Sequence, residues 1–445
     1  MAPFRILVVD DSAFMRKIIS DLIVQDEQFV IAGTAVNGAE ALQLVQQLKP
    51  DAVTLDLEMP VMNGIEALQA IMKQCPVPVI MLSGISEDNT RETIKALQFG
   101  AFDFIRKPSI GAISQHISEV GELLLEKLRI AVVSKRSMAA GQQASEKPKA
   151  SSGKKPTIDV GTAALKKSAI SARKSEQSDK AAMPLLQGNE QKQVSDSVLK
   201  KQASSSVKKK MPSTELINKP SAIIKPVLQN KRQQTDINKN INKSNNKNEF
   251  THLVAIGTST GGPRALHEVI STLPADFAAP VLVVQHMPPK FTKSLAQRLN
   301  NFSSLQVVEA EHGERVHAGT VYIAPGGFHM GLDKDKDGYC INLSSEPQRN
   351  GHRPSVDVLF ESLVSFTELQ RHAVIMTGMG SDGTLGLKQL VASGAASAVA
   401  ESEETCIVYG MPRSAIESGA ANQALPLGQI SGFLEQAVLS KYKEV

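Results

Sequence analysis

One stretch of this sequence cannot form a hydrophobic core, and it divides the chain into two parts. Residues 131–250 contain 24 Lys and Arg but only nine Asp and Glu, and they are rich in Ser, Gln and Asn. This stretch has a net charge of +15, whereas the whole chain carries +4, so the remaining residues carry −11. Such a composition buries too little apolar surface to fold. The sequence therefore predicts a disordered linker over 131–250, a first domain over 1–130 and a second domain over 251–445.

Charge and hydropathy limit the partners and location of the chain. The linker composition favours a solvated spacer, and the alternative is a basic tether that weakly contacts anionic lipid. Outside the linker the chain is acidic and has no basic recognition helix, so we expect no nucleic-acid binding. The N-terminus enters a strand pattern without a signal peptide, and no apolar run is long enough to span a membrane. We therefore expect a cytoplasmic protein that is not integral to the membrane.

The first domain alternates strand and helix patterns. Short apolar runs predict strands, and amphipathic stretches between them predict helices. The expected strands cover residues 5–9, 30–35, 52–55, 79–82 and 102–105, and the expected helices cover 14–24, 39–48, 65–72 and 91–99. This alternation predicts a doubly wound parallel sheet, in which site residues gather beyond the carboxyl ends of the strands.

Residues suited to phosphoryl chemistry follow these strands. Carboxylates that meet at one sheet edge repel one another unless a cation joins them, and such oxygen ligands suit Mg²⁺. An aspartate there can attack a phosphoryl group, a lysine can pair with a phosphoryl oxygen, and a hydroxyl can hydrogen-bond to it. The residues in these positions are Asp10, Asp11, Asp56, Ser83 and Lys107.

With these residues, the first domain resembles the receiver domain of two-component response regulators. The resemblance rests on Ile6–Ser12, Asp56–Pro60 with Gly64, Ser83 and Lys107-Pro108. It implies a flavodoxin-like domain in which Asp56 is the phosphoacceptor. It also implies that Mg²⁺ is held by Asp10, Asp11, Asp56 and the backbone of Glu58, and that the switch residues are Ser83, Phe104 and Lys107.

The second domain shows the same alternation and contains a glycine-rich turn around Ser259. The expected strands cover 253–256, 281–285, 321–324 and 373–377, and the expected helices cover 264–273, 294–300, 356–364 and 385–392. The turn Gly257–Gly262 joins the first strand to the first helix. Such a turn can hold a nucleophilic hydroxyl at the sheet edge, and it can also cradle a phosphate or serve only as a tight connection.

A serine nucleophile needs an imidazole base and a group that orients the imidazole. The second domain contains eight of the nine histidines, and His286 is favoured because it directly follows the apolar run 281–285. Asp382 lies in the glycine-rich stretch Thr377–Gly383, whose unobstructed N–H groups suit an oxyanion hole. The order Ser, His, Asp differs from that of α/β-hydrolases, but catalytic triads occur in several orders.

The second domain resembles the catalytic domain of chemotaxis methylesterases, which are response regulators that demethylate receptor glutamates. The resemblance rests on Ile256–Gly262, Gln285–Pro288, Tyr322–Gly326, His352–Phe360, Thr377–Gly383 and Gly410–Arg413. It implies a parallel-sheet esterase domain with Ser259 as nucleophile, His286 as general base and Asp382 as the group that orients His286. It also implies that the backbone of Met379 assists the oxyanion.

Together, the two resemblances imply a phosphorylation-activated serine hydrolase that demethylates receptor glutamates and deamidates receptor glutamines. The implied partners are the cytoplasmic domains of methyl-accepting chemoreceptors as substrates and a chemotaxis histidine kinase as phosphodonor. Mg²⁺ serves only the receiver, and the esterase step needs no cofactor. The unphosphorylated receiver is expected to pack over the active-site face, and phosphorylation shifts the population away from that state.

Two departures from the family pattern are expected to matter. Ser381 stands where an asparagine is expected beside Asp382, which predicts weaker orientation there. The linker is longer than usual, which predicts weaker autoinhibition because the receiver has a lower effective concentration at the catalytic face. Two other hypotheses stay open at this point. One is a receiver-linked module that binds a nucleotide or phosphate, and the other is a scaffold with a vestigial triad.

Overall fold

The computed structural model describes residues 2–84, 86–107, 113–145 and 250–439. These residues belong to one compact unit that contains two separate parallel sheets. Most of the expected linker lies outside the described residues, and so do predictions about its conformation and its contacts with lipid. None of the described helices has the length and apolarity that a membrane span requires.

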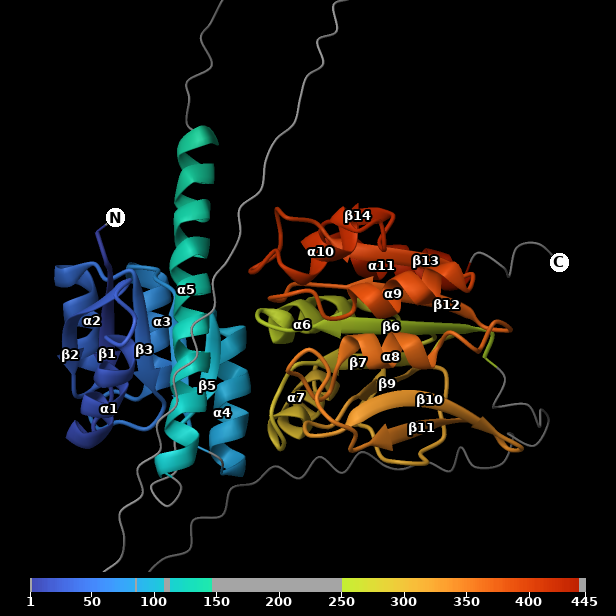
Figure 1. The fold of residues 1–445 in the computed structure, drawn as a ribbon, viewed down its shortest axis with the longest axis horizontal. Coiled ribbons are helices and arrows are strands. Elements are labelled where there is room, and N and C mark those ends of the chain that lie inside the picture. The colour runs from blue at the N-terminus through green and yellow to red at the C-terminus, as the bar shows by residue number, and fades with distance from the viewer. Residues whose placement is uncertain (1, 85, 108–112, 146–249, 440–445) are drawn as a thin grey trace, which may run out of the picture. The chain divides into compact units, whose positions relative to one another are not determined.

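The first sheet has five parallel strands in the order β2-β1-β3-β4-β5, with helices on both faces (Figure 1). Its strands are β1 (Phe4–Val9), β2 (Phe29–Ala35), β3 (Ala52–Asp56), β4 (Val79–Ser83) and β5 (Asp103–Arg106). Its helices are α1 (Ala13–Ile23), α2 (Gly38–Leu48), α3 (Gly64–Gln74), α4 (Glu87–Gln98) and α5 (Ile113–Ser145). The chain reverses direction of winding between β1 and β3, so the loops after these strands share one crevice.

Helix α5 differs from the sequence expectation because it passes the predicted domain boundary at residue 130. It continues to Ser145, within the stretch that was expected to be linker. The reason lies in its apolar residues: Ala131 and Val132 are fully buried, and Val132 packs in the same core cluster as Leu124 and Leu128. Helix α5 therefore extends past the expected boundary of 130, because composition alone does not register these buried apolar residues.

The second sheet has seven parallel strands in the order β14-β13-β12-β6-β7-β9-β8. Its strands are β6 (His252–Thr258), β7 (Val281–Gln285), β8 (Gln306–Glu309), β9 (Thr320–Ile323), β12 (Gln370–Ile375), β13 (Ser397–Glu401) and β14 (Gln423–Leu425). Its helices are α6 (Gly262–Thr272), α7 (Phe291–Asn300), α8 (Val356–Ser362), α9 (Thr384–Ala392), α10 (Met411–Glu417) and α11 (Leu427–Leu439). A separate antiparallel hairpin is formed by β10 (His329–Asp335) and β11 (Gly338–Ser344).

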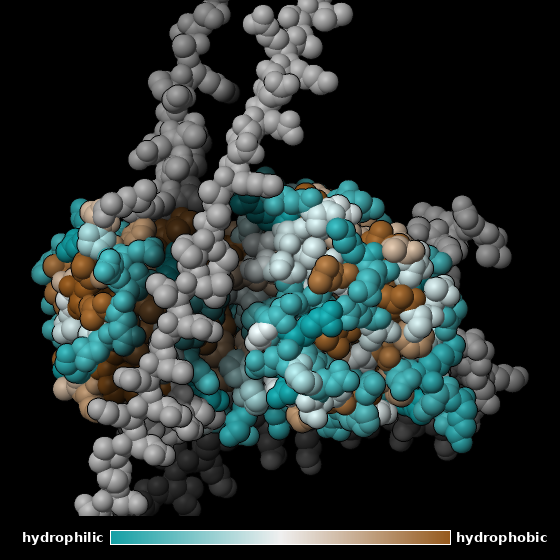
Figure 2. Space-filling model, in the orientation of Figure 1, coloured by the Kyte–Doolittle hydropathy of each residue, from teal (hydrophilic) through white to brown (hydrophobic). Residues whose placement is uncertain are grey.

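Strand β6 lies at the centre of this sheet, between β12 and β7, and all seven of its residues are buried. A strand that is covered on both faces reads as a continuous apolar run, which is the pattern that the sequence shows at Leu253–Ile256. The prediction of two doubly wound parallel α/β sheets is confirmed. The exposed apolar residues of the second domain are interspersed with hydrophilic ones on the face seen in Figure 2, as on ordinary protein surfaces.

The two sheet domains contact each other through α4, β5 and α7. The rings of Phe104 and Phe291 stack with their centroids 4.6 Å apart. The buried hydroxyls of Thr90 and Ser294 lie 2.7 Å apart, and Arg298 Nε donates to Gln98 Oε1 at 2.7 Å. The receiver-like domain therefore contacts the second domain through the α4–β5 region that carries the predicted aromatic switch residue.

Candidate active site

Three adjacent strands of the second sheet bring Ser259, His286 and Asp382 to one edge. Thr258 and Gln285 are paired across β6 and β7, so Ser259 and His286 leave the sheet side by side. On the other side of β6, strand β12 ends at Ile375 and leads into the loop that holds Asp382. The edge coincides with the point where the strand order reverses, which is the usual place for a site in an open parallel sheet.

The turn that carries Ser259 is packed tightly against the loop after β12. The backbone N–H of Ser259 donates to the carbonyl of Thr377 at 3.1 Å, and Gly261 adopts a φ of 82°. A Cβ at Gly378 would stand 2.8 Å from the Ser259 Cβ, which no real contact allows. The glycines of these two segments are therefore required by a positive φ and by the close approach of the two loops.

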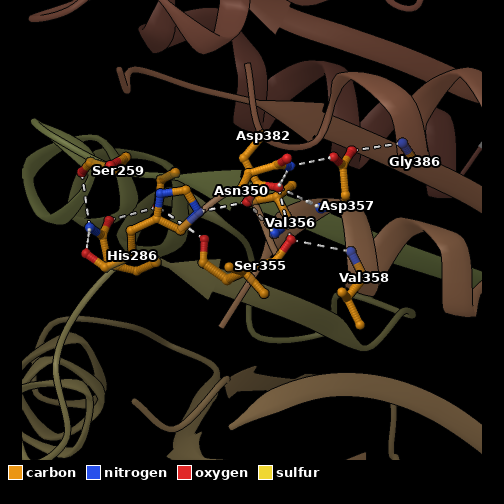
Figure 3. A network of polar contacts seen from close by, with 12 residues as sticks. Ser259, His286, Asn350, Ser355, Val356, Asp357, Val358, Asp382 and Gly386 are labelled. Atoms are coloured by element: carbon orange, nitrogen blue, oxygen red, sulfur yellow. Dashed lines mark hydrogen bonds and ion pairs between the residues drawn. The ribbon is translucent and has the colours of Figure 1, made fainter. Parts of the chain in front are cut away.

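His286 and Asp382 are joined by a short hydrogen bond. The Nε2 atom of His286 lies 2.7 Å from Asp382 Oδ2, and the two side chains are only 6% and 2% exposed. The Nδ1 atom of His286 is buried and has no hydrogen-bond partner among the described residues. In the view of Figure 3, Ser259, His286 and Asp382 follow one another in that order. The free Nδ1 is thus the ring nitrogen that remains for the serine hydroxyl, the reverse of the chymotrypsin arrangement.

Asp382 is held by a dense set of donors. Its carboxylate accepts hydrogen bonds from the hydroxyl of Ser355, the backbone N–H groups of Val356 and Asp357, and Nδ2 of Asn350 (Figure 3). Burial alone raises the pKa of Asp382, but the hydrogen bonds and the charge of His286 outweigh it and hold the pKa well below its usual value. The carboxylate is therefore ionised and fixed in position.

Ser381 was expected to weaken the orientation of Asp382, but a residue from another loop contacts Asp382 instead. Ser381 is exposed, and none of the side chains bonded to Asp382 among the described residues is that of Ser381. Instead, Nδ2 of Asn350 donates to Asp382 Oδ1 at 3.0 Å and to Asp357 Oδ2 at 2.8 Å. An asparagine amide therefore reaches the carboxylate from a position that is distant in the sequence. The effect of Ser381 on activity stays a prediction.

Gln285 is a site residue that the sequence reasoning did not find. Its amide nitrogen donates to the backbone carbonyls of both Ser259, at 2.9 Å, and His286, at 3.1 Å. Its amide oxygen accepts from the Thr258 hydroxyl at 2.7 Å, and the residue is 2% exposed. A buried glutamine at the last position of an apolar strand was the available signal, because a buried polar side chain must find partners.

A cleft of about 250 Å³ opens at this edge and is lined by both domains. The second domain contributes Ser259, Thr260, Asn350, His352, Met379, Gly380, Ser381 and Asp382, and helix α5 contributes Leu123, Glu126, Lys127 and Ile130. The Thr260 hydroxyl, next to Ser259, donates to Asp103 Oδ2 of β5 at 2.6 Å, and the same carboxylate pairs with Lys127. The receiver-like domain therefore borders the predicted nucleophile directly.

The predicted phosphorylation site lies at the edge of the first sheet. Asp10 and Asp56 are buried, Asp11 is exposed, and carboxylate oxygens of all three lie within 4.8 Å of one another. Lys107 Nζ pairs with Asp10 at 2.8 Å and with Asp56 at 2.7 Å. Burial raises the pKa of Asp56 to about 6, against the opposing effect of Lys107.

The donor set of this pocket fits a hard cation. Its three aspartates offer carboxylate oxygens, and the exposed Asp11 leaves room for water, as Mg²⁺ prefers. Glu58 is exposed and lines the same pocket as Asp11. The other predicted switch residues also lie near: Ser83 is buried and accepts from the Thr93 hydroxyl at 2.6 Å, and Phe104 is 7% exposed against Phe291.

Comparisons with known proteins agree with both sheet domains. A family model described as CheB methylesterase matches residues 254–434, and one described as a response regulator receiver domain matches residues 6–118. A protein of Bacillus subtilis (strain 168), named protein-glutamate methylesterase/protein-glutamine glutaminase, is 39% identical over 434 residues and covers 98% of each chain. The chain belongs to this family.

A second relative and one solved structure are also similar to this chain. The protein of that name from Geobacillus kaustophilus (strain HTA426) is 40% identical over 438 residues, which cover 98% of this chain and 99% of its own. The solved catalytic domain of Thermotoga maritima CheB methylesterase is 46% identical and covers 42% of this chain and 99% of its own, with a TM-score of 0.41. The first two relatives match this chain over nearly its whole length and theirs. The expected effect of the long linker on autoinhibition stays a prediction.

Proposed function

We propose that this protein is a phosphorylation-activated hydrolase that removes methyl esters from glutamate side chains of chemoreceptors and deamidates glutamine side chains there. Family membership supports the reaction class. The observation that carries the assignment of residues is the His286–Asp382 pair, which leaves Nδ1 of His286 buried and without a partner among the described residues. The backbone N–H of His286 donates at 3.1 Å to the carbonyl of Thr258, the residue before Ser259. This is the arrangement that a serine nucleophile requires.

In the proposed reaction, the Oγ atom of Ser259 attacks the γ-carbonyl carbon of the substrate while Nδ1 of His286 takes the hydroxyl proton. The negative charge of Asp382 supports the resulting imidazolium, and the backbone of Met379 assists the oxyanion. His286 then gives the proton to the leaving methanol or ammonia, and an acyl-enzyme forms on Ser259. A water molecule, deprotonated by His286, hydrolyses this ester, releases the glutamate carboxylate and restores the serine.

The receiver-like domain would regulate this reaction. Asp56 would accept a phosphoryl group from a chemotaxis histidine kinase, with Mg²⁺ held by Asp10, Asp11, Asp56 and the backbone of Glu58. The cation would offset the charge of the incoming phosphoryl group. The contact of Asp103 with Thr260, the residue after Ser259, supports an inhibitory role for the unphosphorylated domain, because it borders the predicted nucleophile. The stack of Phe104 on Phe291 joins the same two domains. We place the reaction in the cytoplasm.

One assay tests the assignment. Methanol and ammonia release from methylated receptor membranes is measured for the wild type and for Ser259→Ala, His286→Ala and Asp56→Ala, with and without a small-molecule phosphodonor and Mg²⁺. We expect Ser259→Ala and His286→Ala to lose both activities, since they remove the nucleophile and the base. We expect Asp56→Ala to keep basal activity and to lose stimulation. Activity retained in Ser259→Ala would refute the serine mechanism.

A further inference from the structure

A second imidazole lies flat against the predicted general base. The ring of His352 stacks on the ring of His286 with centroids 3.7 Å apart and an angle of 12° between the planes. The hydrogen bond to Asp382 holds only the Nε2 edge of His286. The stacked ring covers a face of the imidazole, which restricts rotation of Nδ1 away from Ser259. The mechanism above assigns no role to His352.

His352 lies in a tight turn, and Asn350 of the same turn contacts Asp382. Arg349 and His352 exchange backbone hydrogen bonds of 3.0 and 2.9 Å across Asn350 and Gly351. The two central residues have φ values of 54° and 79°, which an Asn-Gly pair adopts readily in such a turn. Asn350 donates to Asp382, so one turn contacts both the predicted base and the carboxylate that orients it.

The charge of the second ring also suits this place. Burial, followed by the charge of His286, lowers the pKa of His352 to about 4, and Lys127 acts in the same direction while Asp382 opposes it. The ring is therefore neutral at neutral pH. A neutral neighbour does not repel the imidazolium that forms on His286 during catalysis, whereas a charged one would disfavour it.

We infer that His352 is a positioning residue of the hydrolase: its flat ring holds the His286 imidazole in the orientation that presents Nδ1 to Ser259. This inference rests on the proposed roles of Ser259, His286 and Asp382. It assigns no contact with substrate to His352. What it requires is a planar, uncharged side chain at this position, and the nitrogen atoms of the ring are not needed.

The experiment compares His352→Ala, His352→Leu and His352→Phe in the full chain, with His317→Ala as control because His317 is an exposed histidine of the same domain. We expect His352→Ala and His352→Leu to lower kcat by about tenfold to hundredfold with KM within about twofold, because misalignment of a base mainly affects the transition state. His352→Phe should stay within about threefold of the wild type, since it keeps the flat contact. His317→Ala should behave as the wild type.

A pH profile separates positioning from a general loss of structure. The acidic limb of kcat/KM reports the ionisation of the base in the free enzyme. Removal of the stacked ring admits water to His286 and favours its charged form, so the limb should move to higher pH in His352→Ala and stay in place in His352→Phe. Circular dichroism and thermal unfolding establish whether the variants fold. If His352→Ala does not fold, His352→Leu replaces it in the comparison, because leucine retains apolar volume at this position.

Two results would overturn the inference. The first is a wild-type kcat and acidic limb in both His352→Ala and His352→Leu. The second is a loss in His352→Phe as large as that in His352→Ala, because the ring nitrogens would then matter. If Ser259→Ala and His286→Ala are inactive in the same assay, either of these two results refutes only the role of His352, and the proposed function stands. Activity in those two variants would instead refute the proposed function, and the inference with it.

Discussion

At the scale of single residues, Gln285 connects the two loops on which the proposed chemistry depends. Its amide donates to the carbonyls of Ser259 and His286, so the distance between nucleophile and base depends on one buried side chain. Neither carbonyl can exchange this partner for water easily, because the site is largely buried. Gln285 is buried, so the role that we propose for it is to hold the backbone of both loops.

We predict that Gln285→Ala lowers kcat by about tenfold to hundredfold, because a small displacement of the reacting groups has an effect of this size. The KM should change little. Methanol release from methylated receptor membranes measures both parameters. Gln389→Ala is the matched control, since Gln389 is exposed and its amide contacts only Glu361 among the described residues. Equal activity in the two variants would contradict a positioning role for Gln285.

Gly378 gives a second prediction at this scale. Its missing Cβ leaves room for Ser259, and an added Cβ would lie 2.4 Å from Met411 Sδ and 2.8 Å from Ser259 Cβ. Gly378→Ala should therefore displace the serine turn, destabilise the fold by about 1–3 kcal/mol and reduce methanol release severely. Chemical denaturation and the same assay measure the two effects.

Gly432→Ala is the control for Gly378→Ala. Gly432 lies within helix α11, and a Cβ there meets no atom within 4 Å. Alanine is the better helix former, so this variant should gain about 0.5–1 kcal/mol and keep full activity. A normal activity in Gly378→Ala would show that the loop after β12 can move away from Ser259.

The sequence predicted those site residues that follow apolar strands. Ser259 and His286 stand directly after such runs, and Asp382 lies in a glycine-rich stretch after another, so position alone indicated a shared edge. Asn350 and His352 could not be found in this way. Their contacts with Asp382 and His286 depend on a turn that folds back over the sheet edge, and periodicity carries no information about such a turn.

At the scale of elements, strand β5 and helix α5 contribute to the boundary of the active-site cleft. Asp103 of β5 binds both the Thr260 hydroxyl and Lys127 of α5, and it is the residue before Phe104. A change at the phosphorylation edge of the first sheet can therefore reach the serine turn through β5. This placement supports the proposed inhibitory contact.

We predict that Asp103→Ala raises basal methanol release by about tenfold to hundredfold without a phosphodonor, since the lost hydrogen bond to a charged group costs the closed state about 1.5–3 kcal/mol. Asp26→Ala is the matched control, because Asp26 also pairs with a basic residue of α5, Arg129, and its side-chain partners among the described residues lie in the first domain. An equal rise in both variants would attribute the effect to α5 as a whole.

Element predictions succeeded where apolar runs were long and failed where elements are short or partly exposed. Strand β14 has three residues, none of them buried, and three of the seven residues of β10 are exposed, so neither shows a distinct pattern. Helix α11 is strongly apolar, but the last helix expected from the sequence covered 385–392, so α11 was missed. Helix α5 was not among the expected helices, and the basic composition that begins near residue 131 placed the domain boundary before its end.

At the scale of the whole molecule, buried histidines predict how stability depends on pH. His372 is 3% exposed, its Nδ1 lies 2.9 Å from the Ser397 hydroxyl and its Nε2 lies 3.0 Å from His252 Nδ1. Burial, followed by the charge of His252, lowers the pKa of His372 to about 4. Burial is also the main reason that the pKa of His352 is lowered to about 4. Both rings are neutral in the folded protein at neutral pH.

The free energy of unfolding should therefore fall as the pH drops from about 6.5 to about 4, because the unfolded chain binds protons there that the folded chain does not. Each pKa unit corresponds to about 1.4 kcal/mol. Urea denaturation near pH 7 and near pH 5 measures the change. His372→Gln should reduce this pH dependence, while His317→Gln, at an exposed position, should leave it as in the wild type. The same slope in all three proteins would exclude His372 as a source.

The central place of β6 has a consequence for biosynthesis. This strand leaves the ribosome more than a hundred residues before β12, its hydrogen-bonded neighbour, and Asp382 emerges later still. Pairings between such distant segments form slowly and only after both have been synthesised. A nascent chain that already displays Ser259 and His286 thus lacks Asp382, the proposed orienting carboxylate, until that later segment has been translated. We therefore expect no hydrolase activity before then.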